Sequence, residues 1–265
     1  MSENGEDGRN MMMSDKAGFV AGVANHRSIS WAIARALDRE GARLVLGYLG
    51  ERERTGIEKI AGQLSAPPVL VQCDVGDDQS VEAAFSQVAG EVGKLDFLVH
   101  GIAFANREDL DGRYTDTSRD GYRLALEVSA YSLNCLVRGA EPLMTAGGGV
   151  VALTYLGSER AVRNYNVMGV AKAALESGIR YLASELGEKN IRVNGLSAGP
   201  LKTLASRGIR DFNLMHRAHA ERAPLRRNTD LEEVADAALF LCSHLSRGIT
   251  GEVLYVDGGY RIMGI

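Results

Sequence analysis

The 265-residue chain contains few cysteines and no long apolar run, and these absences exclude several classes of protein. Its three cysteines (Cys73, Cys135 and Cys242) are odd in number and far apart, which argues against a disulfide framework and predicts reduced thiols. No uninterrupted apolar stretch approaches the ~18 residues that a membrane-spanning helix needs. The amino terminus lacks a basic segment followed by an apolar core, so a secretory signal is not expected. We therefore expect a cytoplasmic protein with no membrane partner.

The chain also lacks an excess of either charge, since 30 Lys and Arg residues stand against 34 Asp and Glu residues. Because acidic and basic residues are interspersed, neither nucleic acid nor an anionic membrane is expected as the main partner. There are only five prolines, no proline- or serine-rich linker divides the chain, and no solenoid-type repeat is visible. Hydrophobic residues make up 45% of the chain, enough to form a core without disulfides or a structural metal. We expect one domain.

What the chain does contain is a regular alternation of apolar runs and amphipathic segments. Apolar runs typical of buried parallel strands cover residues 18–23, 43–48, 68–72, 95–100, 149–154, 192–197 and 253–256. Amphipathic segments typical of helices cover residues 30–40, 51–64, 80–92, 120–144, 167–187 and 231–245. This pattern predicts an α/β fold, a single Rossmann-type doubly wound domain of about seven parallel strands with helices on both faces. We expect the domain to span residues 15–265, after a loose amino-terminal extension over residues 1–14.

Two segments in the last third of the chain carry further signals. Thr229 followed by Glu232 has the spacing of a capping box, which predicts the start of the helix over residues 231–245. The stretch 199–224 instead interrupts the strand–helix rhythm with a Gly-Pro pair and a polar, weakly amphipathic run. An insertion between a strand end and the next helix is typical of a mobile substrate-binding lid. The alternative is a surface helical excursion with no role.

Small and polar residues follow three of the expected strands, where a dinucleotide would bind. Gly22, Ser28 and Ile29 lie in the turn into the first helix, where backbone N–H groups and the helix end would face a pyrophosphate. Asp74 closes the third strand and offers a carboxylate to an adenine amino group, while Ile102 follows the fourth strand in a run of small residues. Because the first turn lacks three-glycine spacing, an ordinary strand–helix turn is the alternative. Three such ends along one sheet edge favour dinucleotide binding.

Tyr165 and Lys172 are seven residues apart in a segment expected to be helical. At roughly 100° per residue, this spacing corresponds to about two turns and places both side chains on nearly the same face. A phenol and an ammonium so placed could hold a ligand between them, one at a reacting oxygen and the other at a sugar hydroxyl. For an isolated pair, the alternative is a helix whose Tyr and Lys simply face solvent.

The chain resembles the short-chain dehydrogenase/reductase family throughout, and specifically its divergent branch of bacterial enoyl-acyl-carrier-protein reductases. The resemblance covers about residues 16–262. Its motifs are Gly-Val-Ala-Asn…Arg-Ser-Ile (22–29), Cys-Asp-Val (73–75), Ile-Ala-Phe-Ala (102–105), Tyr-Leu-Gly-Ser-Glu-Arg (155–160), Asn-Tyr-Asn-Val-Met-Gly-Val-Ala-Lys (164–172), Ile-Arg-Val-Asn (191–194), Ser-Ala-Gly-Pro (197–200) and Gly-Ile-Thr-Gly-Glu-Val…Val-Asp-Gly-Gly (248–259). The last motif belongs to the wider family, whereas the Tyr-x6-Lys spacing and Ser-Ala-Gly-Pro are more specific.

The chain departs from the commoner ketoreductase pattern of that family at two positions. Ketoreductases carry a lysine four residues after the tyrosine, and that position is Gly169 here. They also carry a serine thirteen residues before the tyrosine, and that position is Ala152. The chain has a second tyrosine instead, Tyr155, which fits a substrate whose carbonyl is polarised while the hydride is delivered elsewhere.

The resemblance implies reduction of the trans-2 double bond of enoyl thioesters on acyl carrier protein, a step of bacterial fatty-acid elongation, by a homotetramer. It implies that Tyr155, Tyr165 and Lys172 are catalytic. The implied cofactor contacts are Gly22, Ser28, Ile29, Leu49, Asp74, Val75, Ile102, Lys172, Leu201, Lys202, Thr203, Leu204 and Ala205. The implied substrate contacts are Ala105, Tyr155, Tyr165, Phe212 and Met215.

The choice between NADH and NADPH depends on the residues that follow the second strand. An acidic residue directly after this strand would favour a free 2′-hydroxyl, and a basic pair would favour a 2′-phosphate. Leu49 is neither, and Glu51 and Arg52 nearby have opposite charges. We expect NADH, with NADPH as the alternative.

Three other readings of the chain remain as alternatives or are set aside. A carbonyl reductase or alcohol dehydrogenase of the same family is the enzymatic alternative, and a non-catalytic dinucleotide-sensing module is the other. His216 and His219 could lie on one helical face as metal ligands, but no third ligand accompanies them, so we expect no metal site.

Overall fold

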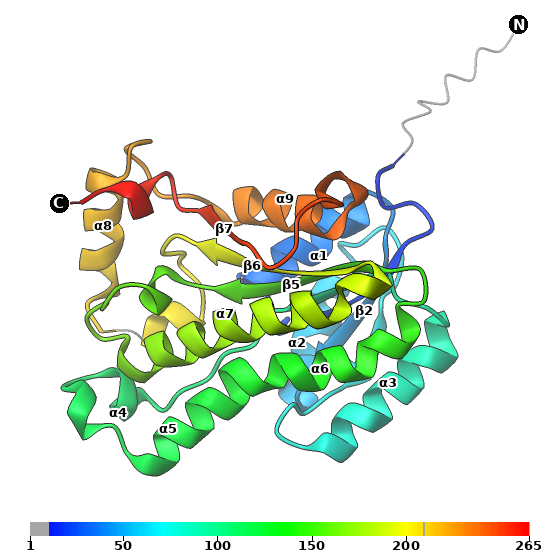
Figure 1. Cartoon of the computed structure of the whole chain (residues 1–265), viewed down its shortest axis with the longest axis horizontal. Helices are drawn as coiled ribbons and strands as arrows, with labels where there is room; N and C mark the ends of the chain where they lie inside the picture. The colour runs from blue at the N-terminus through cyan, green and yellow to red at the C-terminus, as the bar shows by residue number, and fades with distance from the viewer. Residues whose placement is uncertain (1–10, 209, 265) are drawn as a thin grey trace, which may run out of the picture.

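Seven parallel strands form one sheet in the order β3-β2-β1-β4-β5-β6-β7 (Figure 1). This computed structural model describes residues 11–208 and 210–264, without the side chains of residues 205 and 207. The strands are β1 Ala17–Ala21, β2 Arg43–Tyr48, β3 Val69–Gln72, β4 Phe97–His100, β5 Gly148–Thr154, β6 Ile191–Ala198 and β7 Val253–Val256. Each lies within a few residues of a predicted strand, and the predicted fold class is confirmed.

The strand order reverses beside β1, which pairs with β2 on one side and with β4 on the other. Val20 is opposite Leu46 in the first pair and opposite Val99 in the second. In a parallel sheet, the two loops that leave such neighbouring strands turn to opposite faces and open a crevice at the carboxyl edge. The fold therefore creates a binding crevice at the end of β1 and β4.

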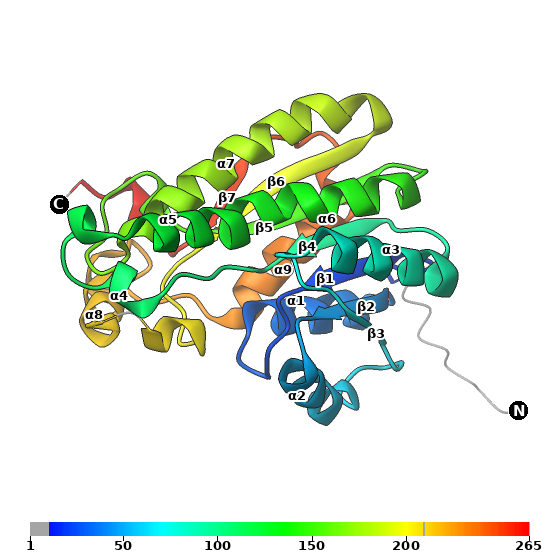
Figure 2. The same ribbon diagram turned by 90° about the horizontal axis from the view of Figure 1, so that it is seen from below.

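Helices cover both faces of the sheet (Figure 2). One face carries α1 Ile29–Arg39, α2 Glu51–Ala61 and α9 Leu231–Cys242. The other carries α3 Asp78–Val92, α5 Arg119–Leu126, α6 Ser132–Ala140 and α7 Asn166–Leu186. Two further helices, α4 Arg107–Leu110 and α8 Phe212–Arg222, lie at the end of the molecule toward which the strands point. No helix in the described ranges is long and apolar enough to cross a membrane.

The core consists of two apolar clusters, one on each side of the sheet. Trp31, Leu37 and Leu239 belong to the first, beneath α1 and α9. Phe85 and Ile179 belong to the second, beneath α3 and α7. Successive strand residues alternate between the clusters, so both faces of each central strand are apolar. Full burial of each large apolar side chain stabilises the fold by about 1.5–3 kcal/mol and holds the strand ends in fixed positions.

The helix α9 starts at Leu231 as predicted, but its N-cap differs from the predicted one by one residue. Asp230 is the N-cap, and its carboxylate accepts a hydrogen bond from the Glu233 backbone N–H at 2.9 Å. The Glu233 carboxylate accepts the Asp230 N–H in return at 2.9 Å. The predicted pair of Thr229 and Glu232 was wrong, because Thr229 is buried and its hydroxyl bonds the Val256 carbonyl.

The single helix predicted over residues 120–144 is interrupted by a π-helical turn at Glu127–Tyr131. Serine hydroxyls explain the interruption. Ser129 Oγ accepts a hydrogen bond from the Phe104 N–H at 2.9 Å and donates to the Phe104 carbonyl at 3.0 Å. The turn therefore anchors the loop after β4, which lines the site described below.

The expected loose extension over residues 1–14 is wrong for its last part. Met13 is only 2% exposed and belongs to the core, and its N–H donates to the Glu40 carbonyl at 2.8 Å. Residues 1–10 lie outside the described residues.

Candidate active site

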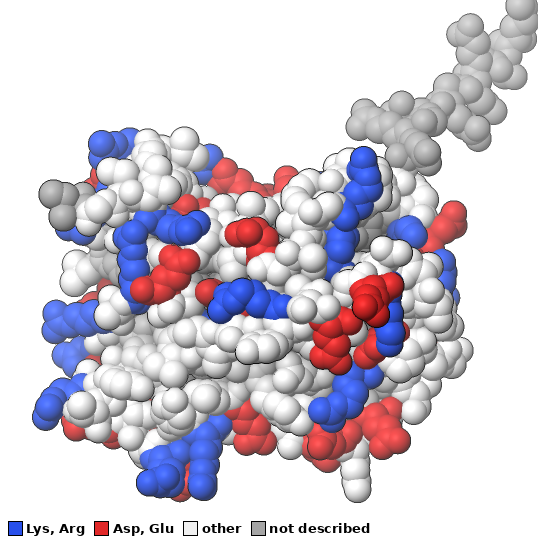
Figure 3. Space-filling view, in the orientation of Figure 1, with Lys and Arg blue, Asp and Glu red and all other residues white. Residues whose placement is uncertain are grey.

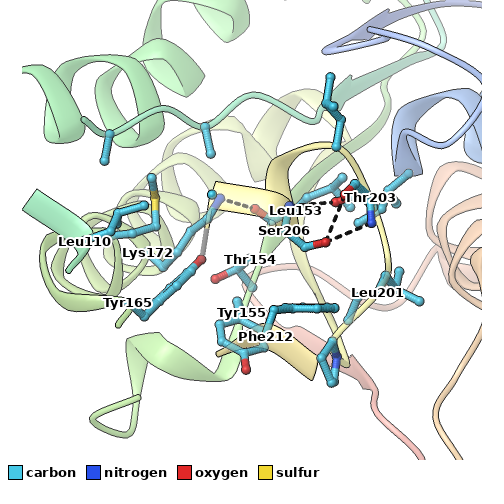
Figure 4. Close-up of a pocket in the computed structure, with 18 of the residues that line it drawn as sticks. Leu110, Leu153, Thr154, Tyr155, Tyr165, Lys172, Leu201, Thr203, Ser206 and Phe212 are labelled. Carbon is cyan, nitrogen blue, oxygen red and sulfur yellow. Dashed lines mark hydrogen bonds between the residues drawn. The ribbon is translucent and has the colours of Figure 1, made fainter. Parts of the chain in front are cut away.

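A cavity of about 450 Å³ opens at the carboxyl edge of the sheet, beside the crevice at β1 and β4 (Figure 4). The structure brings eleven of the predicted site residues together in its wall: Ile29, Ile102, Ala105, Tyr155, Tyr165, Lys172, Leu201, Thr203, Leu204, Phe212 and Met215. They come from the first turn of α1, the ends of β4, β5 and β6, the start of α7, and α8. The cavity thus extends from the proposed dinucleotide edge to the α8 segment.

The start of α7 sets the relation between Tyr165 and Lys172. Tyr165 is the N-cap residue and α7 begins at Asn166, so Lys172 lies two turns into the helix. Just before Tyr165, Asn164 has a left-handed backbone with φ 62° and donates from Nδ2 to the Arg210 carbonyl at 2.9 Å. An asparagine tolerates this conformation better than most residues. The turn directs Tyr165 back along the helix, and Figure 4 shows it beside Lys172 at the cavity wall.

Lys172 is almost completely buried, with 5% of its surface exposed. Its Nζ donates a hydrogen bond to the Leu153 carbonyl at 2.7 Å. Burial lowers the pKa of Lys172 to about 8, because the charged ammonium loses its hydration, while the nearby Glu176 opposes this shift. The ammonium is therefore held at a fixed position in the cavity wall.

Tyr155 and Tyr165 pack edge to face, with ring centroids 4.9 Å apart and planes at 67°. The Tyr155 hydroxyl points to the Met215 sulfur at 3.4 Å, which links the end of β5 to α8. Burial raises the pKa of Tyr155 to about 12 and raises the pKa of Tyr165 well above its usual range. Both phenols are protonated at neutral pH, so each can donate a hydrogen bond to an oxygen in the cavity.

The packing of α7 explains the two departures from the ketoreductase pattern. A Cβ atom on Gly169 would lie 2.7 Å from the Gly157 carbonyl oxygen, so no lysine fits four residues after Tyr165 without a backbone shift. Ala152 is fully buried in the core beneath α6 and α7. It is therefore Thr154 and Tyr155, at the end of the same strand, that reach the cavity.

At the crevice, the turns that follow β1 and β4 pack closely against each other, which requires glycine. Gly22 has φ 85°, and a Cβ atom there would lie 2.1 Å from the Gly101 carbonyl oxygen. Ser28 caps α1 by accepting the Trp31 N–H at 3.3 Å, and Ile29 opens the helix. The glycine pair and the positive end of α1 fit a dinucleotide pyrophosphate.

Several predicted cofactor residues lie along the sheet edge outside the cavity wall. Asp74 and Val75 follow β3, where the Asp74 carboxylate bonds the Gly76 N–H at 2.9 Å. Leu49 follows β2 and is 55% exposed. Lys202 is exposed between two residues that line the cavity, Leu201 and Thr203, and Ala205 begins a 3-10 helix, Ala205–Gly208.

The segment after β6 folds over the cavity through a local hydrogen-bond network. Ser206 Oγ accepts the Thr203 N–H at 3.0 Å and donates to the Thr203 carbonyl at 2.9 Å. Beyond it, Phe212 of α8 contributes to the wall (Figure 4), and Met215 of the same helix also lines the cavity. A helix in this stretch was predicted only as the alternative of a surface helical excursion, because the sequence of α8 is polar and only weakly amphipathic.

The cavity wall also contains residues that were not among the predicted cofactor or substrate contacts, although some of them lie in the quoted motifs. They are Gly101, Ala103, Phe104, Arg107, Leu110, Leu153, Thr154, Met168, Ala198, Gly199, Pro200, Ser206 and Gly208. Met168, three residues after Tyr165 on one helical face, could have been found from the helical period. Arg107 and Leu110 depend on the path of the loop after β4, for which the sequence gives no signal.

The two histidines of α8 have separate partners. His216 Nδ1 lies 3.0 Å from Asn228 Nδ2, whereas the ring of His219 stacks on Tyr260 with centroids 4.5 Å apart. Within the described residues, no group of three or more His, Cys, Asp or Glu side chains is arranged to hold a metal ion.

Comparison with known proteins agrees with this geometry. A family model described as enoyl-(acyl carrier protein) reductase matches residues 22–261. The enoyl-acyl-carrier-protein reductase (NADH) FabI of Bacillus cereus is 51% identical, over 96% of this chain and 99% of that relative. The NADPH-named FabI of Staphylococcus aureus is 49% identical, over 94% and 98%. A crystal structure of the Bacillus cereus reductase with NADP+ and indole naphthyridinone has a TM-score of 0.94 at 50% identity, covering 96% of this chain and 99% of that one. The chain belongs to the enoyl-acyl-carrier-protein reductase family.

Proposed function

We propose that this protein reduces the trans-2 double bond of enoyl thioesters carried on acyl carrier protein, in the elongation of fatty acids. The observation that carries the proposal is the joint placement of Tyr165 and Lys172 in the wall of one cavity, with Tyr155 packed against Tyr165. Two neutral phenols and one ammonium are suited to stabilising a developing negative charge on an oxygen.

A reduced nicotinamide dinucleotide, when bound, supplies the hydride for the β-carbon of the enoyl chain. As that carbon accepts the hydride, electrons move onto the thioester oxygen to form an enolate. Tyr165 donates a hydrogen bond to this oxygen, and Tyr155 lines the acyl pocket and orients the thioester. Proton addition at the α-carbon then completes the saturated thioester. The substrate gains one hydride and one proton, and the dinucleotide is oxidised.

Lys172 holds the hydroxyl groups of the nicotinamide ribose and contributes positive charge near the enolate. The pyrophosphate would be held by Gly22, Ser28 and Ile29. Two observations support this assignment: the close contact between Gly22 and Gly101, and the amino-terminal end of α1 at this edge of the sheet. Asp74 and Val75 would hold the adenine. Ile102 would hold the ribose and nicotinamide, and the nicotinamide would be covered by Leu201, Lys202, Thr203, Leu204 and Ala205.

NADH is the favoured cofactor. Leu49 offers no charge to a 2′-phosphate at the end of β2. Arg54 nearby already pairs with Glu58 at 3.0 Å and Glu51 at 3.6 Å, which reduces the positive charge available at this edge. NADPH remains the alternative, since relatives of both names exist.

The segment 199–224 acts as a lid that closes over the acyl chain. Its residues Phe212 and Met215 line the cavity, as does Ala105 in the segment after β4. The Tyr155–Met215 contact links lid position to the orientation of a catalytic side chain.

An acidic carrier protein fits the charge at this end of the molecule. In Figure 3, Lys and Arg side chains gather along the left edge, over α8 above and α5 below, whereas acidic groups gather at the lower right. Among the described wall residues, the two charged ones are Lys172 and the exposed Arg107. We infer that Arg107 binds the phosphate of the carrier's phosphopantetheine arm.

The alternatives have less support. A carbonyl reductase would need a hydroxyl at Ala152 and a lysine at Gly169, and the core packing at both positions opposes them. A sensing module that binds without turnover would not need the Tyr165–Lys172 pair.

The protein works as a homotetramer in the cytoplasm under this proposal. The outer strand β7 has its four residues only half-buried, and Tyr181 on α7 is 78% exposed, so apolar surface remains for association. The buried free thiols of Cys73, Cys135 and Cys242 suit a reducing compartment. Sedimentation would measure the oligomeric state, and a monomer at working concentration would contradict it.

Incubating the protein with NADH or NADPH and a short thioester tests the proposed reaction. Oxidation of NADH with crotonyl thioester is expected, with little or none with acetoacetyl thioester. Oxidation with acetoacetyl thioester alone would show a carbonyl reductase, and cofactor binding without oxidation would show a sensor.

A further inference from the structure

Glu176 is a buried carboxylate one helical turn after Lys172. Residues four apart on a helix are neighbours on one face, about 6 Å apart at their Cβ atoms. Glu176 is 7% exposed and Lys172 is 5% exposed, so water screens neither charge well. Among the described residues, no cationic group forms a salt bridge with Glu176, although a buried carboxylate is costly unless it is compensated.

Both side chains are fixed to the same strand end. The Thr154 hydroxyl donates to Glu176 Oε1 at 2.6 Å. Lys172 Nζ donates to the carbonyl of Leu153, the residue before Thr154, at 2.7 Å. Thr154 and Leu153 close β5 directly before Tyr155. Glu176 does not line the cavity, so it acts on the reaction only through its neighbours.

We propose that Glu176, held by Thr154, is a positioning residue that keeps Lys172 as an ammonium directed at the cavity. This inference rests on the proposed function, because it assigns Glu176 a part in holding the cofactor ribose and stabilising the enolate. The carboxylate supplies the negative charge that balances the buried lysine.

The groups around the pair support this assignment. His100, at the end of β4, is fully buried, and burial, with a smaller contribution from Lys172, lowers its pKa to about 3, so it is neutral at working pH. Tyr165 on the cavity side is a neutral phenol, and Tyr255 on β7, near Glu176, has a pKa raised above its usual range by burial and by Glu159. Glu176 is thus the one anionic group among these neighbours, and it opposes the effect of burial on the pKa of Lys172.

The Glu176→Gln substitution tests the proposal, because it keeps the shape and the Thr154 contact but removes the charge. The pH dependence of kcat/KM for crotonyl thioester is measured at saturating NADH. The alkaline limb of this profile, where activity falls as Lys172 loses its proton, should move to lower pH by about one unit. Activity should then fall about fivefold at pH 8 and approach a tenfold loss at higher pH, while activity near pH 6 changes little. Glu185→Gln, at an exposed position of the same helix, is the matched control and should leave the limb in place.

An alkaline limb at the same pH in folded Glu176→Gln protein would overturn the proposal. If the Gln variant does not fold, Glu176→Asp keeps the charge and should retain the limb near the wild-type pH. If the alkaline limb of Glu176→Asp also moved to lower pH, as far as is expected for the loss of the charge, the result would contradict the proposal.

NADH binding, followed by fluorescence over the same pH range, separates this proposal from the proposed reaction. Binding to Glu176→Gln should weaken at lower pH than binding to wild type, whatever the thioester specificity. If wild type reduces no enoyl thioester but this shift occurs, the proposed function fails and the link between Glu176 and Lys172 stands. If wild type reduces enoyl thioesters and both profiles are unchanged, the link fails alone.

Discussion

Gly169 lies against Gly157, so close that a Cβ atom on Gly169 would be 2.7 Å from the Gly157 carbonyl oxygen. Gly157 in turn lies against the Tyr165 ring, where a Cβ atom would be 2.5 Å from Cδ1. The first turns of α7, the segment after β5 and the Tyr165 ring therefore pack without space for a side chain. This contact fixes the position of the Tyr165 ring. Because residue 169 has no space for a lysine, the ammonium that faces the cavity comes from the following turn of the helix, at Lys172.

Gly169→Ala should lower both stability and turnover. Although alanine favours a helix by about 1 kcal/mol, the clash with the Gly157 carbonyl should dominate and destabilise the fold by about 1–3 kcal/mol. Gly178→Ala on the same helix is the control, because its nearest contact for a Cβ atom is 4.0 Å away, at the Asn134 side chain. Denaturant unfolding should show the control to be as stable as wild type or more stable. Equal stability of the two variants would contradict the packing argument.

Tyr165→Phe should retain NADH affinity and lose most turnover. Removing one donor from an oxyanion-stabilising group lowers kcat by about 10²–10³-fold, while the ring and its packing remain. NADH titration and steady-state kinetics measure the two effects separately. Tyr181→Phe, at a residue that is 78% exposed on the same helix, should match wild type in both measurements. Unchanged kcat in Tyr165→Phe would remove this hydroxyl from the chemistry.

Activity should fall as the pH rises through about 8, because burial lowers the pKa of Lys172 to about 8 and the ammonium is the active form. Below this pH the lysine keeps its proton, so no loss is expected from this group. A profile of kcat/KM against pH measures the limb. Lys172→Arg should reduce activity but abolish the limb, since a guanidinium stays charged. If the activity of Lys172→Arg still falls at alkaline pH, the group that titrates is not Lys172.

Arg107→Gln should weaken only those substrates that carry a phosphate. We expect a several-fold rise in KM for crotonyl thioesters of 4′-phosphopantetheine and of the carrier protein, from the loss of one charge-assisted contact. The crotonyl thioester of N-acetylcysteamine, which has no phosphate, should be unaffected. Arg113→Gln, at an exposed residue that follows α4 and lies outside the cavity wall, is the control. Equal effects on all three thioesters would show that Arg107 does not bind the phosphate.

The strands were predictable because buried parallel strands are continuous apolar runs. The ranges of β2 and β7 agree with prediction, since Arg43 and Val253 begin runs bounded by polar or glycine-rich segments. The capping box was shifted by one residue because Thr229 and Asp230 are both good N-caps and both are followed by a glutamate three residues later. Only burial of Thr229 decides between them.

Helix interruptions and loop paths were not predictable, because they depend on contacts between distant segments. The π-helical turn at Glu127–Tyr131 forms where Ser129 bonds the Phe104 backbone, and no local period encodes that contact. The spacing of Tyr165 and Lys172, read together with the family motifs, predicted that both side chains face one site, and the structure places both in the cavity wall. Arg107 was not predicted, because no local spacing places it at the cavity. The path of the chain after β4 brings it there.

The position to which the hydride is transferred tests the central claim most directly. NADH carrying deuterium at the transferable position of nicotinamide C4 is incubated with crotonyl thioester, and the product is examined by mass spectrometry and NMR. We predict an intact butyryl thioester with deuterium on its β-carbon. Deuterium at a former carbonyl carbon, or a labelled 3-hydroxybutyryl thioester formed from acetoacetyl thioester while crotonyl thioester is unchanged, would contradict the account.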